Sequence, residues 1–311
     1  MIRSLKLINN TWFDSFKACL SLFDKEHMSL GHLKISKASH DDLPDIVPLR
    51  PEGWGDLEPD IRFYLDAWFC ELVKLEVNQV LVGIGAVIDL GRTKWLAHII
   101  VGEPFRNQGL GYRIVDHLMQ GLTLAPEGPV LLIATQLGEP VYKKFGFRRV
   151  GQYLFFERKP PGQAQNTDRP NPFDPGLSGG GLNIIDFTPQ WKGRLFSLDE
   201  QICGEDRQLI LDRYLPRAKL AVRDHILAGF YIPGFKGGPI IADDDAAGLA
   251  LMELKYATVN SAVLPQENQS GRQFLIENGF KEVSRCSRMI KGDGIAWAPE
   301  KIYSRISGNF G

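Results

Sequence analysis

The sequence is poor in cysteine, and this scarcity narrows the kinds of site that it can build. Its four cysteines lie far apart in the 311 residues, at Cys19, Cys70, Cys203 and Cys286. None belongs to a CxxC pair or a Cys/His cluster, so the sequence predicts no metal site and does not require disulfides. Few, dispersed cysteines are typical of a reducing compartment, which predicts a cytoplasmic protein.

Two further absences limit the partners of the chain. No uninterrupted apolar run reaches the length needed to cross a membrane. The 36 Lys and Arg residues almost balance the 37 Asp and Glu residues, which argues against a broad nucleic-acid surface. We therefore expect neither a membrane nor a nucleic acid as a partner. The chain itself is expected to be a monomer or a homodimer.

Residues 1–30 are expected to form an N-terminal extension. Trp12, Phe16, Leu20 and Phe23 recur at helical spacing, which predicts an amphipathic helix. Asn, Asp and Lys interrupt the apolar stretch that a signal peptide would need, so a secretory signal is disfavoured. A frayed extension is the alternative to a packed helix, and Met28 is an alternative start of the chain.

Hydrophobic patterning divides the rest of the chain into two halves. Residues 31–158 and 182–291 are regularly patterned. Residues 159–181 are rich in Pro and Gly and lack periodicity, as in a linker. Residues 292–311 are expected to form a loop-like tail. The length of the chain and this pattern predict two domains of mixed α/β class.

In the first half the pattern alternates between strands and helices. Ser39 is a candidate N-cap, and Asn78-Gln79 is the expected turn of a β-hairpin over residues 76–90. Apolar residues almost all round predict a largely buried helix over residues 61–73. Strands are also expected over 33–38, 93–101, 129–136 and 148–158, and helices over 110–122 and 139–147, the last ended by Gly146.

The two halves share landmarks at nearly constant spacing. YKKFGFRRV in the first half resembles LIENGFKEV in the second, with Gly146 and Gly279 as matching glycines, 133 positions apart. Gly109 corresponds to about Asp245, an offset of 136. Two landmarks at almost one offset indicate a diverged tandem repeat.

The stretch RNQGLG, from Arg106 to Gly111, carries the strongest chemical signal. It follows a strand and opens a helix, where unpaired amides and the helix dipole form an anion site. Gly109 and Gly111 remove side chains that would hold a phosphate away, and Arg106 adds a charged fork. A P-loop would need Gly-Lys-Ser/Thr here, and a dinucleotide fingerprint would need glycine at Ile114. A tight strand-to-helix turn without a ligand is the structural alternative.

Two motifs together give this region a family resemblance. Arg106-x-x-Gly109-x-Gly111 resembles the acyl-CoA loop of the GNAT superfamily of N-acyltransferases, and Tyr142 with Gly146-Phe147 resembles the segment that follows it in that family. The resemblance covers Leu33 to Arg158, with the elements in the expected order. It implies two tandem GNAT-type domains, each with a twisted central sheet flanked by helices.

The resemblance also implies a cofactor site and a reaction. The backbone of Ile99, Ile100 and Val101 is expected to pair with the pantetheine arm of acetyl-CoA. Its pyrophosphate is expected to lie on Arg106, Asn107, Gln108, Gly109, Leu110, Gly111 and Tyr112. An amine would then attack the acetyl thioester directly, without a covalent enzyme intermediate, and the cleft would position and polarise the carbonyl.

Tyr142 and His98 are the candidate catalytic residues. The phenol of Tyr142 can protonate a departing thiolate; alternatively its hydroxyl is satisfied by the backbone and the ring merely packs. His98 has the pKa range of a base near neutrality, although strand alternation places it opposite Val101 unless a bulge changes the parity. A structural histidine is the alternative, and Glu103 is the other candidate base. Arg113, Lys143 and Lys144 either neutralise CoA phosphates or are simply solvated.

The second half resembles the C-terminal domain of bacterial tandem GNAT proteins, but its chemistry differs. ADDDAAG stands where the loop should be, without the arginine and the paired glycines, and Leu275 replaces the tyrosine. Three aspartates would repel a pyrophosphate, so Asp243 to Asp245 are expected to cap a helix instead. This half is expected to brace the first and to wall the acceptor pocket, with Asp206, Arg207, Asn268 and the acidic run as candidate acceptor contacts.

These observations predict an acetyl-CoA-dependent N-acetyltransferase with one active site, in the first half, and no metal. The acceptor would be a primary amine of a small molecule. A protein N-acetyltransferase is the alternative within the same chemistry. A non-catalytic acyl-CoA-binding or regulatory module is the alternative of a different class.

Overall fold

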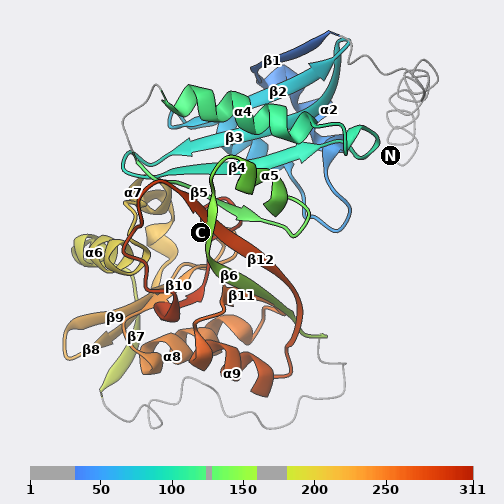
Figure 1. Ribbon diagram of the computed structural model, residues 1–311. Coiled ribbons are helices and arrows are strands. Elements are labelled where there is room, and N and C mark those ends of the chain that lie inside the picture. The colour runs from blue at the N-terminus through green and yellow to red at the C-terminus, as the bar shows by residue number, and fades with distance from the viewer. Residues whose placement is uncertain (1–31, 124–127, 160–180, 311) are drawn as a thin grey trace, which may run out of the picture.

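The computed structural model describes residues 32–123, 128–159 and 181–310. The predicted N-terminal extension and the bulk of the predicted linker lie outside the described residues. The described chain forms a first half, residues 32–159, and a second half, residues 181–310, which lie one above the other in Figure 1. None of the helices in these ranges is long and apolar enough to cross a membrane.

Strands and helices alternate in both halves, as the sequence predicted. The first half contains strands β1 (Leu33–Lys37), β2 (Cys70–Val77), β3 (Val80–Asp89), β4 (Lys94–Val101), β5 (Val130–Ala134) and β6 (Arg148–Glu157), and helices α2 (Leu43–Ile46), α3 (Glu58–Asp66), α4 (Leu110–Thr123) and α5 (Glu139–Lys144). The second half contains strands β7 (Leu182–Asp186), β8 (Lys219–Arg223), β9 (Ile226–Tyr231), β10 (Ile240–Ala242), β11 (Ser261–Pro265), β12 (Lys281–Lys291) and β13 (Ile302–Ser304), and helices α6 (Lys192–Cys203), α7 (Gln208–Leu211), α8 (Asp245–Tyr256) and α9 (Gln269–Glu277).

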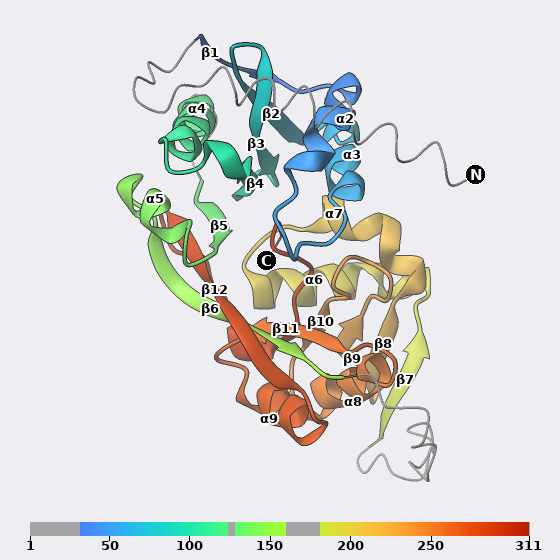
Figure 2. The ribbon, with the colours of Figure 1, turned by 90° about the vertical axis from the view of Figure 1, so that its right-hand side faces the viewer.

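The strands form two sheets that do not follow the division into halves. The eight-stranded sheet has the order β1-β2-β3-β4-β5-β12-β6-β11, and the five-stranded sheet has the order β13-β10-β9-β8-β7. Strand β12 of the second half lies between β5 and β6 and is antiparallel to both. Figure 2 shows the long ribbon of β12 and β6 running from one half into the other.

The two halves therefore exchange a strand reciprocally. In each half a short helix joins the fifth strand to the sixth: α5 joins β5 to β6, and α9 joins β11 to β12. In the order β5-β12-β6-β11, each fifth strand pairs with the sixth strand of the other half. Neither half thus completes its sheet with its own strands.

Local features explain where several elements begin and end. Ser39 is the N-cap of a 3-10 turn (His40–Asp42), where its side chain and Asp42 form a reciprocal capping box. Asn78 and Gln79 both have positive φ, 51° and 68°, as a two-residue hairpin turn requires. Gly146 follows α5 with φ 83°. All three sequence predictions are confirmed.

The predicted buried helix over residues 61–73 is wrong. Helix α3 ends at Asp66, the chain turns at Ala67 to extended backbone, and β2 begins at Cys70. Leu72 and Val73 are consecutive and both buried, because β2 is covered on both faces. Such a strand shows no polar alternation, so its apolar run continued the pattern of the helix before it.

The predicted loop-like tail is also wrong in part. Residues 299–301 form a 3-10 turn and Ile302–Ser304 form β13, which pairs with β10. The chain then runs to Phe310, which is buried. In Figures 1 and 2 the C-terminus lies between the two halves.

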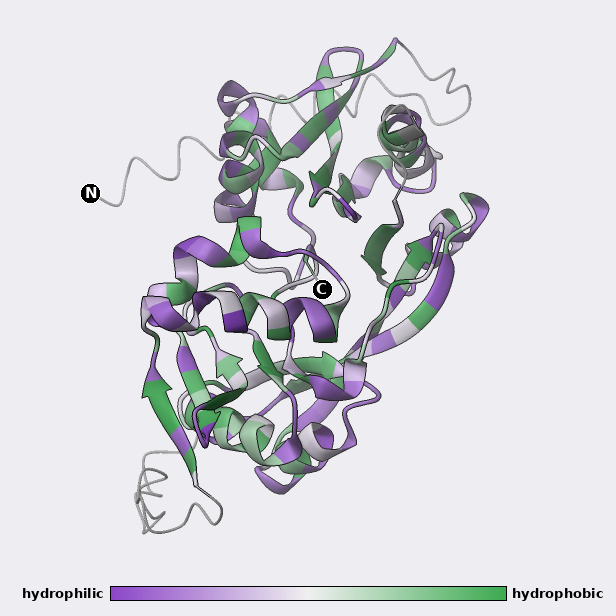
Figure 3. Ribbon diagram, turned by 90° about the vertical axis from the view of Figure 1, so that its left-hand side faces the viewer, coloured by the Kyte–Doolittle hydropathy of each residue, from purple (hydrophilic) through white to green (hydrophobic). Residues whose placement is uncertain are grey.

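A hydrophobic core crosses the boundary between the halves. One cluster of buried side chains contains Trp95 and Leu131 of the first half together with Ile202, Phe230 and Phe310 of the second. Figure 3 shows hydrophobic residues concentrated along the strands, with hydrophilic residues on the outer turns of the helices. Shared burial and shared strands make the two halves one folding unit.

Candidate active site

Strands β4 and β5 meet at one end and separate at the other. They are parallel and pair only at Lys94 with Val130 and at Trp95 with Leu131. Beyond Trp95 the edge of β4 that faces β5 has no ladder partner among the described strands. The backbone of Ile99, Ile100 and Val101 lies along this open edge. An extended ligand can therefore pair there as an added strand does.

Buried polar groups fix the point where the two strands separate. Glu205 of the second half accepts hydrogen bonds from the Trp95 indole at 2.6 Å and from Thr93 at 3.1 Å. Arg288 of β12 donates to the other Glu205 oxygen at 3.1 Å and stacks over the Trp297 ring at 4.3 Å. A buried ion pair satisfied in this way sets geometry more than it adds stability.

A bulge in β4 turns His98 toward the space between the halves. The pairing with β3 shifts between Ala86–Ala97 and Ile84–Ile100, and His98 has φ 45°. The extra residue changes the alternation of the strand, which is the condition under which His98 could reach the site. A non-glycine residue with positive φ also stores backbone strain.

His98 is partly buried and has one hydrogen-bond partner. Its Nδ1 lies 2.7 Å from the Tyr64 hydroxyl, and its ring meets Trp54 edge-on at 5.9 Å between centroids. Burial lowers the pKa of His98 below 6.5, and Lys236 acts in the same direction, while Asp60 opposes them. The imidazole is therefore neutral near pH 7 and able to accept a proton.

Tyr142 lies on α5 with its side chain directed into the same space. The residue is 9% exposed, and its ring packs edge-on against Phe147 at 6.1 Å. Its hydroxyl makes no hydrogen bond to any described residue, so the structure does not support the alternative in which the backbone satisfies it. Burial raises the pKa of Tyr142 well above 10, which keeps the phenol protonated.

Glu139 holds the first turn of α5 in place. Its carboxylate accepts hydrogen bonds from Arg149 of β6 at 2.7 Å and from Ser287 of β12 at 2.7 Å, and it pairs with Lys143 at 2.8 Å. These partners lower the pKa of Glu139 to about 2. Lys143 is thus committed to Glu139. Because Tyr142 lies one turn further along, the helix that carries it is fixed to both halves.

The backbone N–H groups of the loop before α4 lack hydrogen-bond acceptors. No backbone carbonyl in the described chain accepts a hydrogen bond from the N–H groups of residues 107–112. No heavy atom lies within 4 Å of a Cβ placed on Gly109, and a Cβ on Gly111 would meet only Val101, at 3.9 Å. Arg106 donates from Nε to the Val101 carbonyl at 3.1 Å, which ties the loop to the end of β4.

The other predicted residues of this loop, except Leu110, lie at the surface of the protein. Asn107 is exposed with φ 63°, and the Gln108 side chain reaches the Pro104 carbonyl at 3.4 Å. Leu110 is buried and begins α4, while Tyr112 stacks on Phe145 at 4.5 Å. Glu103, Arg113 and Lys144 are exposed to solvent, and Glu103 does not line the cavity described next.

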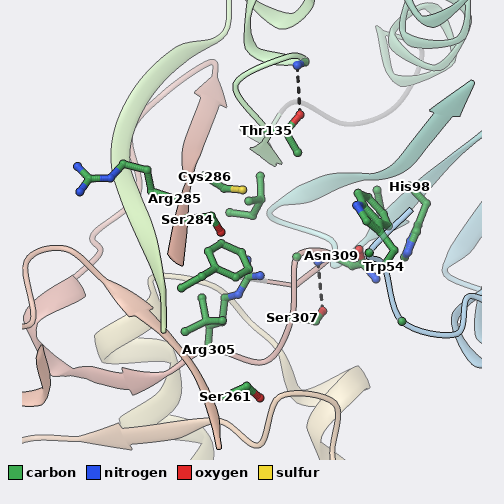
Figure 4. Close-up of a pocket in the computed structure, with 18 of the residues that line it drawn as sticks. Trp54, His98, Thr135, Ser261, Ser284, Arg285, Cys286, Arg305, Ser307 and Asn309 are labelled. Carbon is green, nitrogen blue, oxygen red and sulfur yellow. Dashed lines mark hydrogen bonds between the residues drawn. The ribbon is translucent and has the colours of Figure 1, made fainter. Parts of the chain in front are cut away.

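His98 and Tyr142 line one cavity of about 1120 Å³ between the halves. The first half supplies the segment around Trp54 and Asp60, the bulge of β4 and the end of β5. The second half supplies residues 282–286 of β12, and Arg305 and residues 307–309 of the tail. In Figure 4 these side chains converge from the two halves on one space. The second half therefore walls the cavity, as the sequence predicted.

The specific acceptor contacts predicted in the second half are wrong. Arg207 is buried and pairs with Asp199 at 2.5 Å, and Asn268 is buried as the N-cap of α9. Asp206 receives the Gln208 amide at 3.2 Å, and Asp243 pairs with Lys301 at 2.7 Å. None of them lines the cavity. These polar side chains cap helices or form ion pairs within the protein. The sequence alone does not distinguish such residues from residues that contact a ligand.

Of the three aspartates predicted to cap a helix, Asp244 is the N-cap of α8 and Asp245 lies in its first turn, whereas Asp243 does not cap it. Asp244 accepts the Ala247 amide at 2.9 Å as the N-cap, and it also pairs with Arg223 at 2.6 Å. Asp245 accepts hydrogen bonds from Ser270 and from the Tyr303 hydroxyl, each at 2.5 Å. The amides that would meet an anion in the first half are thus already served by carboxylates here.

Strand β13 fills the opening that corresponds to the gap between β4 and β5. In the second half the matching strands are β10 and β11, and β13 pairs with β10 at Ile240–Ser304. The Arg305 amide then donates to Val263 of β11 at 3.2 Å, and Asn268 donates to the Ile302 carbonyl at 3.1 Å. The chain's own tail takes the place that an extended ligand has in the first half.

Three lining residues had no sequence signal of a site: Asp60, Arg305 and Asn309. The Asp60 carboxylate accepts hydrogen bonds from Lys236 Nζ at 2.5 Å and from Asn309 Nδ2 at 3.1 Å. This one carboxylate therefore links α3 to the second half and its tail. Within the described ranges no group of His, Cys, Asp and Glu side chains could hold a metal ion.

Comparisons with known proteins agree with this geometry. The sequence profile of an acetyltransferase (GNAT) domain matches residues 69–158, and a second acetyltransferase (GNAT) domain profile matches residues 195–304. Because both profiles describe this domain, the chain belongs to the GNAT acetyltransferases and carries two such domains in tandem. A comparison with curated proteins gives no match.

Solved structures share the fold at low sequence identity. A protein from Pyrococcus horikoshii described as a candidate acetyltransferase is 19% identical, with a TM-score of 0.72 over 93% of this chain and 100% of its own. A GCN5-related N-acetyltransferase from Sphaerobacter thermophilus is 16% identical, with a TM-score of 0.58 over 85% and 98%. A tandem GNAT protein from the clavulanic acid biosynthesis pathway is 12% identical, with a TM-score of 0.54 over 85% and 100%.

Proposed function

We propose that the first half transfers an acetyl group from acetyl-CoA to the primary amine of a small molecule. The observation that carries this proposal is the meeting of an open strand edge with a cavity in which a neutral His98 and an unbonded Tyr142 hydroxyl both lie. A concave cavity of about 1120 Å³ lined by both halves suits a small acceptor.

The residues before α4 fit the pyrophosphate of acetyl-CoA. The free amides of residues 107–112 stand at the N-terminus of a 14-residue helix, where partial positive charge gathers. Gly109 and Gly111 leave the approach open, and the Nη groups of Arg106 remain for phosphate oxygens. The thioester, when bound, supplies the activated acetyl group.

His98 and Tyr142 divide the proton transfers of the reaction. His98 takes a proton from the acceptor ammonium, directly or through a water molecule, with Nδ1–H donating to Tyr64 and Nε2 as the base. The neutral amine forms the new C–N bond to the carbonyl carbon, and the C–S bond breaks. Tyr142 then gives its proton to the leaving sulfur, and the second proton of the attacking nitrogen, which becomes acidic once the C–N bond has formed, passes to the tyrosinate, directly or through water. Burial holds both groups in the states that these steps need.

We infer that the second half binds no acyl-CoA. Strand β13 pairs along β10 where the pantetheine arm would lie, and Asp244 and Asp245 occupy the start of α8 with carboxylates. Titration of the full chain with acetyl-CoA is expected to give a stoichiometry of one. A stoichiometry of two would contradict this assignment.

Release of free thiol from acetyl-CoA in the presence of an amine library tests the proposed reaction. Tyr142→Phe is expected to slow the acceptor-dependent signal by roughly 10²-fold, because the leaving sulfur loses its proton donor. Gly109→Asp is expected to abolish cofactor binding, because it places a carboxylate and a strained side chain in the cradle.

Gly91→Asp is the matched control for that second variant. Gly91 also has positive φ, 79°, and open space around it, but it lies in the β3–β4 turn. It should carry the same backbone penalty and keep acetyl-CoA binding. Tight binding of acetyl-CoA without turnover on any amine would refute the enzyme and favour a non-catalytic acyl-CoA-binding module.

A further inference from the structure

Arg305 is a buried cation without a partner. The residue follows β13 and is 9% exposed, and its guanidinium makes no hydrogen bond and no ion pair with any described residue. Its Nη1 is fully enclosed. Its only compensation is stacking between two rings of β6, with Phe155 at 4.8 Å and Tyr153 at 5.0 Å.

The other buried arginines show what this position lacks. Arg207 pairs with Asp199 at 2.5 Å, and Arg288 pairs with Glu205 at 3.1 Å. A buried charge normally has such a counter-ion, because removing a charge from water without one is costly. The two rings pack against the guanidinium and give its N–H groups no acceptor, and Nε and Nη2, unlike Nη1, are not enclosed, so a planar anion can reach them.

Arg305 lines the cavity that holds His98 and Tyr142. It also borders a smaller cavity of about 360 Å³ in the second half, which contains neither residue. Figure 4 shows Arg305 well apart from His98 and Trp54, with Ser307 and Asn309 in the region between them. The loop of residues 106–112 does not line the cavity, so the phosphates expected there do not explain the arginine.

We propose that Arg305 binds an anionic group, a carboxylate or a phosphate, of the acceptor whose amine reaches His98 and Tyr142. The inference rests on the proposed function, because it names the substrate class of that site. The acceptor is then zwitterionic, with an amine at the end of the cavity near Asp60 and His98 and an anion at the other end. Amino acids and amino phosphates belong to this class.

Anion-dependent thermal stabilisation tests the site without requiring turnover. At constant ionic strength, replacing chloride by inorganic phosphate or by citrate is expected to raise the melting temperature of the full chain. Arg305→Met keeps the stacked volume and removes the charge, so its shift should be clearly smaller than that of the unaltered chain, whereas the shift from anions at the loop before α4 should be common to all variants. Arg305→Lys keeps a cation without the planar fork and should show an intermediate shift.

Arg285→Met is the matched control. Arg285 also lines the cavity, but it pairs with Glu282, and Figure 4 shows it pointing away from the other side chains. This variant should keep the full anion shift. Absence of the shift in the unaltered chain, or an equal shift in Arg305→Met, would overturn the proposal.

Matched acceptors identify the source of the anion. With an amino acid as acceptor, Arg305→Met should raise KM roughly 10- to 100-fold, and with the decarboxylated amine it should leave KM unchanged. A loss that appears only with succinyl-CoA, and equally for both acceptors, would place the anion on the acyl group and overturn the assignment. Acetyl-CoA affinity, measured by calorimetry, should be equal in all variants. A chain that binds anions through Arg305 but acetylates no amine would refute the proposed function and leave the anion site standing.

Discussion

Desolvation sets the protonation states of His98 and Tyr142 in opposite directions. Burial makes the charged form of each side chain less stable, so it lowers the pKa of the histidine and raises that of the tyrosine. A neutral imidazole can accept a proton, and a protonated phenol can donate one. One physical cause thus leaves β4 with a group that can accept a proton and α5 with a group that can donate one.

The pH dependence of the reaction follows from the direction of the His98 shift. The activity should fall as pH drops through a value below 6.5, because protonated His98 can no longer take the ammonium proton, and it should be flat from there to neutral pH. His98→Gln should lower kcat by roughly 10²- to 10⁴-fold and remove this acidic limb. Rate measurements from pH 5 to 8 are the readout. An acidic limb that survives in the variant would assign the base to another group.

Sequence reasoning found the residues whose signal is local. Gly109, Gly111 and Tyr142 lie in short motifs beside a strand and a helix, so their position follows from their neighbours. Arg305 has no such context, because the tail around it carries no hydrophobic period. Its importance depends on missing partners and stacked rings that come from β6, far away in sequence.

At the scale of elements, α5 shows how a short helix is held rigid. Six residues form too few hydrogen bonds for a stable isolated helix, so tertiary contacts must fix it. Glu139 supplies them at the first turn, through Arg149 on β6 and Ser287 on β12. The orientation of Tyr142 therefore depends on a carboxylate that does not line the cavity.

Glu139→Gln should lower the stability of the protein and its turnover together. The folded pKa of Glu139 is depressed to about 2 from 4.5, so its contribution is fully present above pH 4.5 and is lost as pH falls toward 2. We expect a loss of ~2 kcal/mol at pH 7, allowing for solvent screening of the half-exposed Arg149 and Lys143. Denaturant unfolding at pH 7 and at pH 3 should show the difference from the unaltered protein shrinking in acid.

Glu58→Gln is the control for this change. Glu58 also begins a helix, precedes a proline and pairs with a cation four residues on, Arg62, but both side chains are largely exposed. Its replacement should cost less than 1 kcal/mol. An equal loss for both variants would show that the cross-strand contacts of Glu139 add nothing.

Elements with their own boundary signals were predictable, and those defined by burial were not. The Asn78-Gln79 turn, the Ser39 cap and the glycine after α5 are encoded by residues whose backbone preferences are local. The boundary between α3 and β2 has no such marker, because the apolar residues on either side of Ala67 fit both the helical and the strand periodicity. Strand β13 was missed because its partners, β10 and β11, are distant in sequence.

At the scale of the whole molecule, the exchange of β6 and β12 could not be predicted from either repeat. Each strand has the same alternation whether it pairs within its own half or with the other. The choice is made by long-range packing, including the core that contains Trp95, Leu131 and Phe230. The family resemblance correctly predicted tandem GNAT domains and a mixed α/β fold, but not the division of strands between the two sheets.

Two separately encoded chains should reconstitute the protein. Residues 1–159 and 181–311, expressed together, are expected to copurify and to bind acetyl-CoA, because β12 completes the sheet of the first chain and β6 that of the second. Either chain expressed alone should self-associate through its exposed strand edges. Size-exclusion chromatography and calorimetry are the readouts. A first fragment that is monomeric, stable and active alone would contradict this dependence.

The ladder β5-β12-β6-β11 also limits how the enzyme can move. Enzymes that bind a substrate between two lobes commonly close by a hinge, which needs a few backbone positions free to bend. Here the cavity is bridged by continuous strand pairing, and bending it would break hydrogen bonds along β6 and β12. The spacing between His98 and Arg305 is consequently fixed before any acceptor arrives. If His98 and Arg305 hold the two ends of the acceptor, as we propose, the enzyme should prefer acceptors of one length between amine and anion.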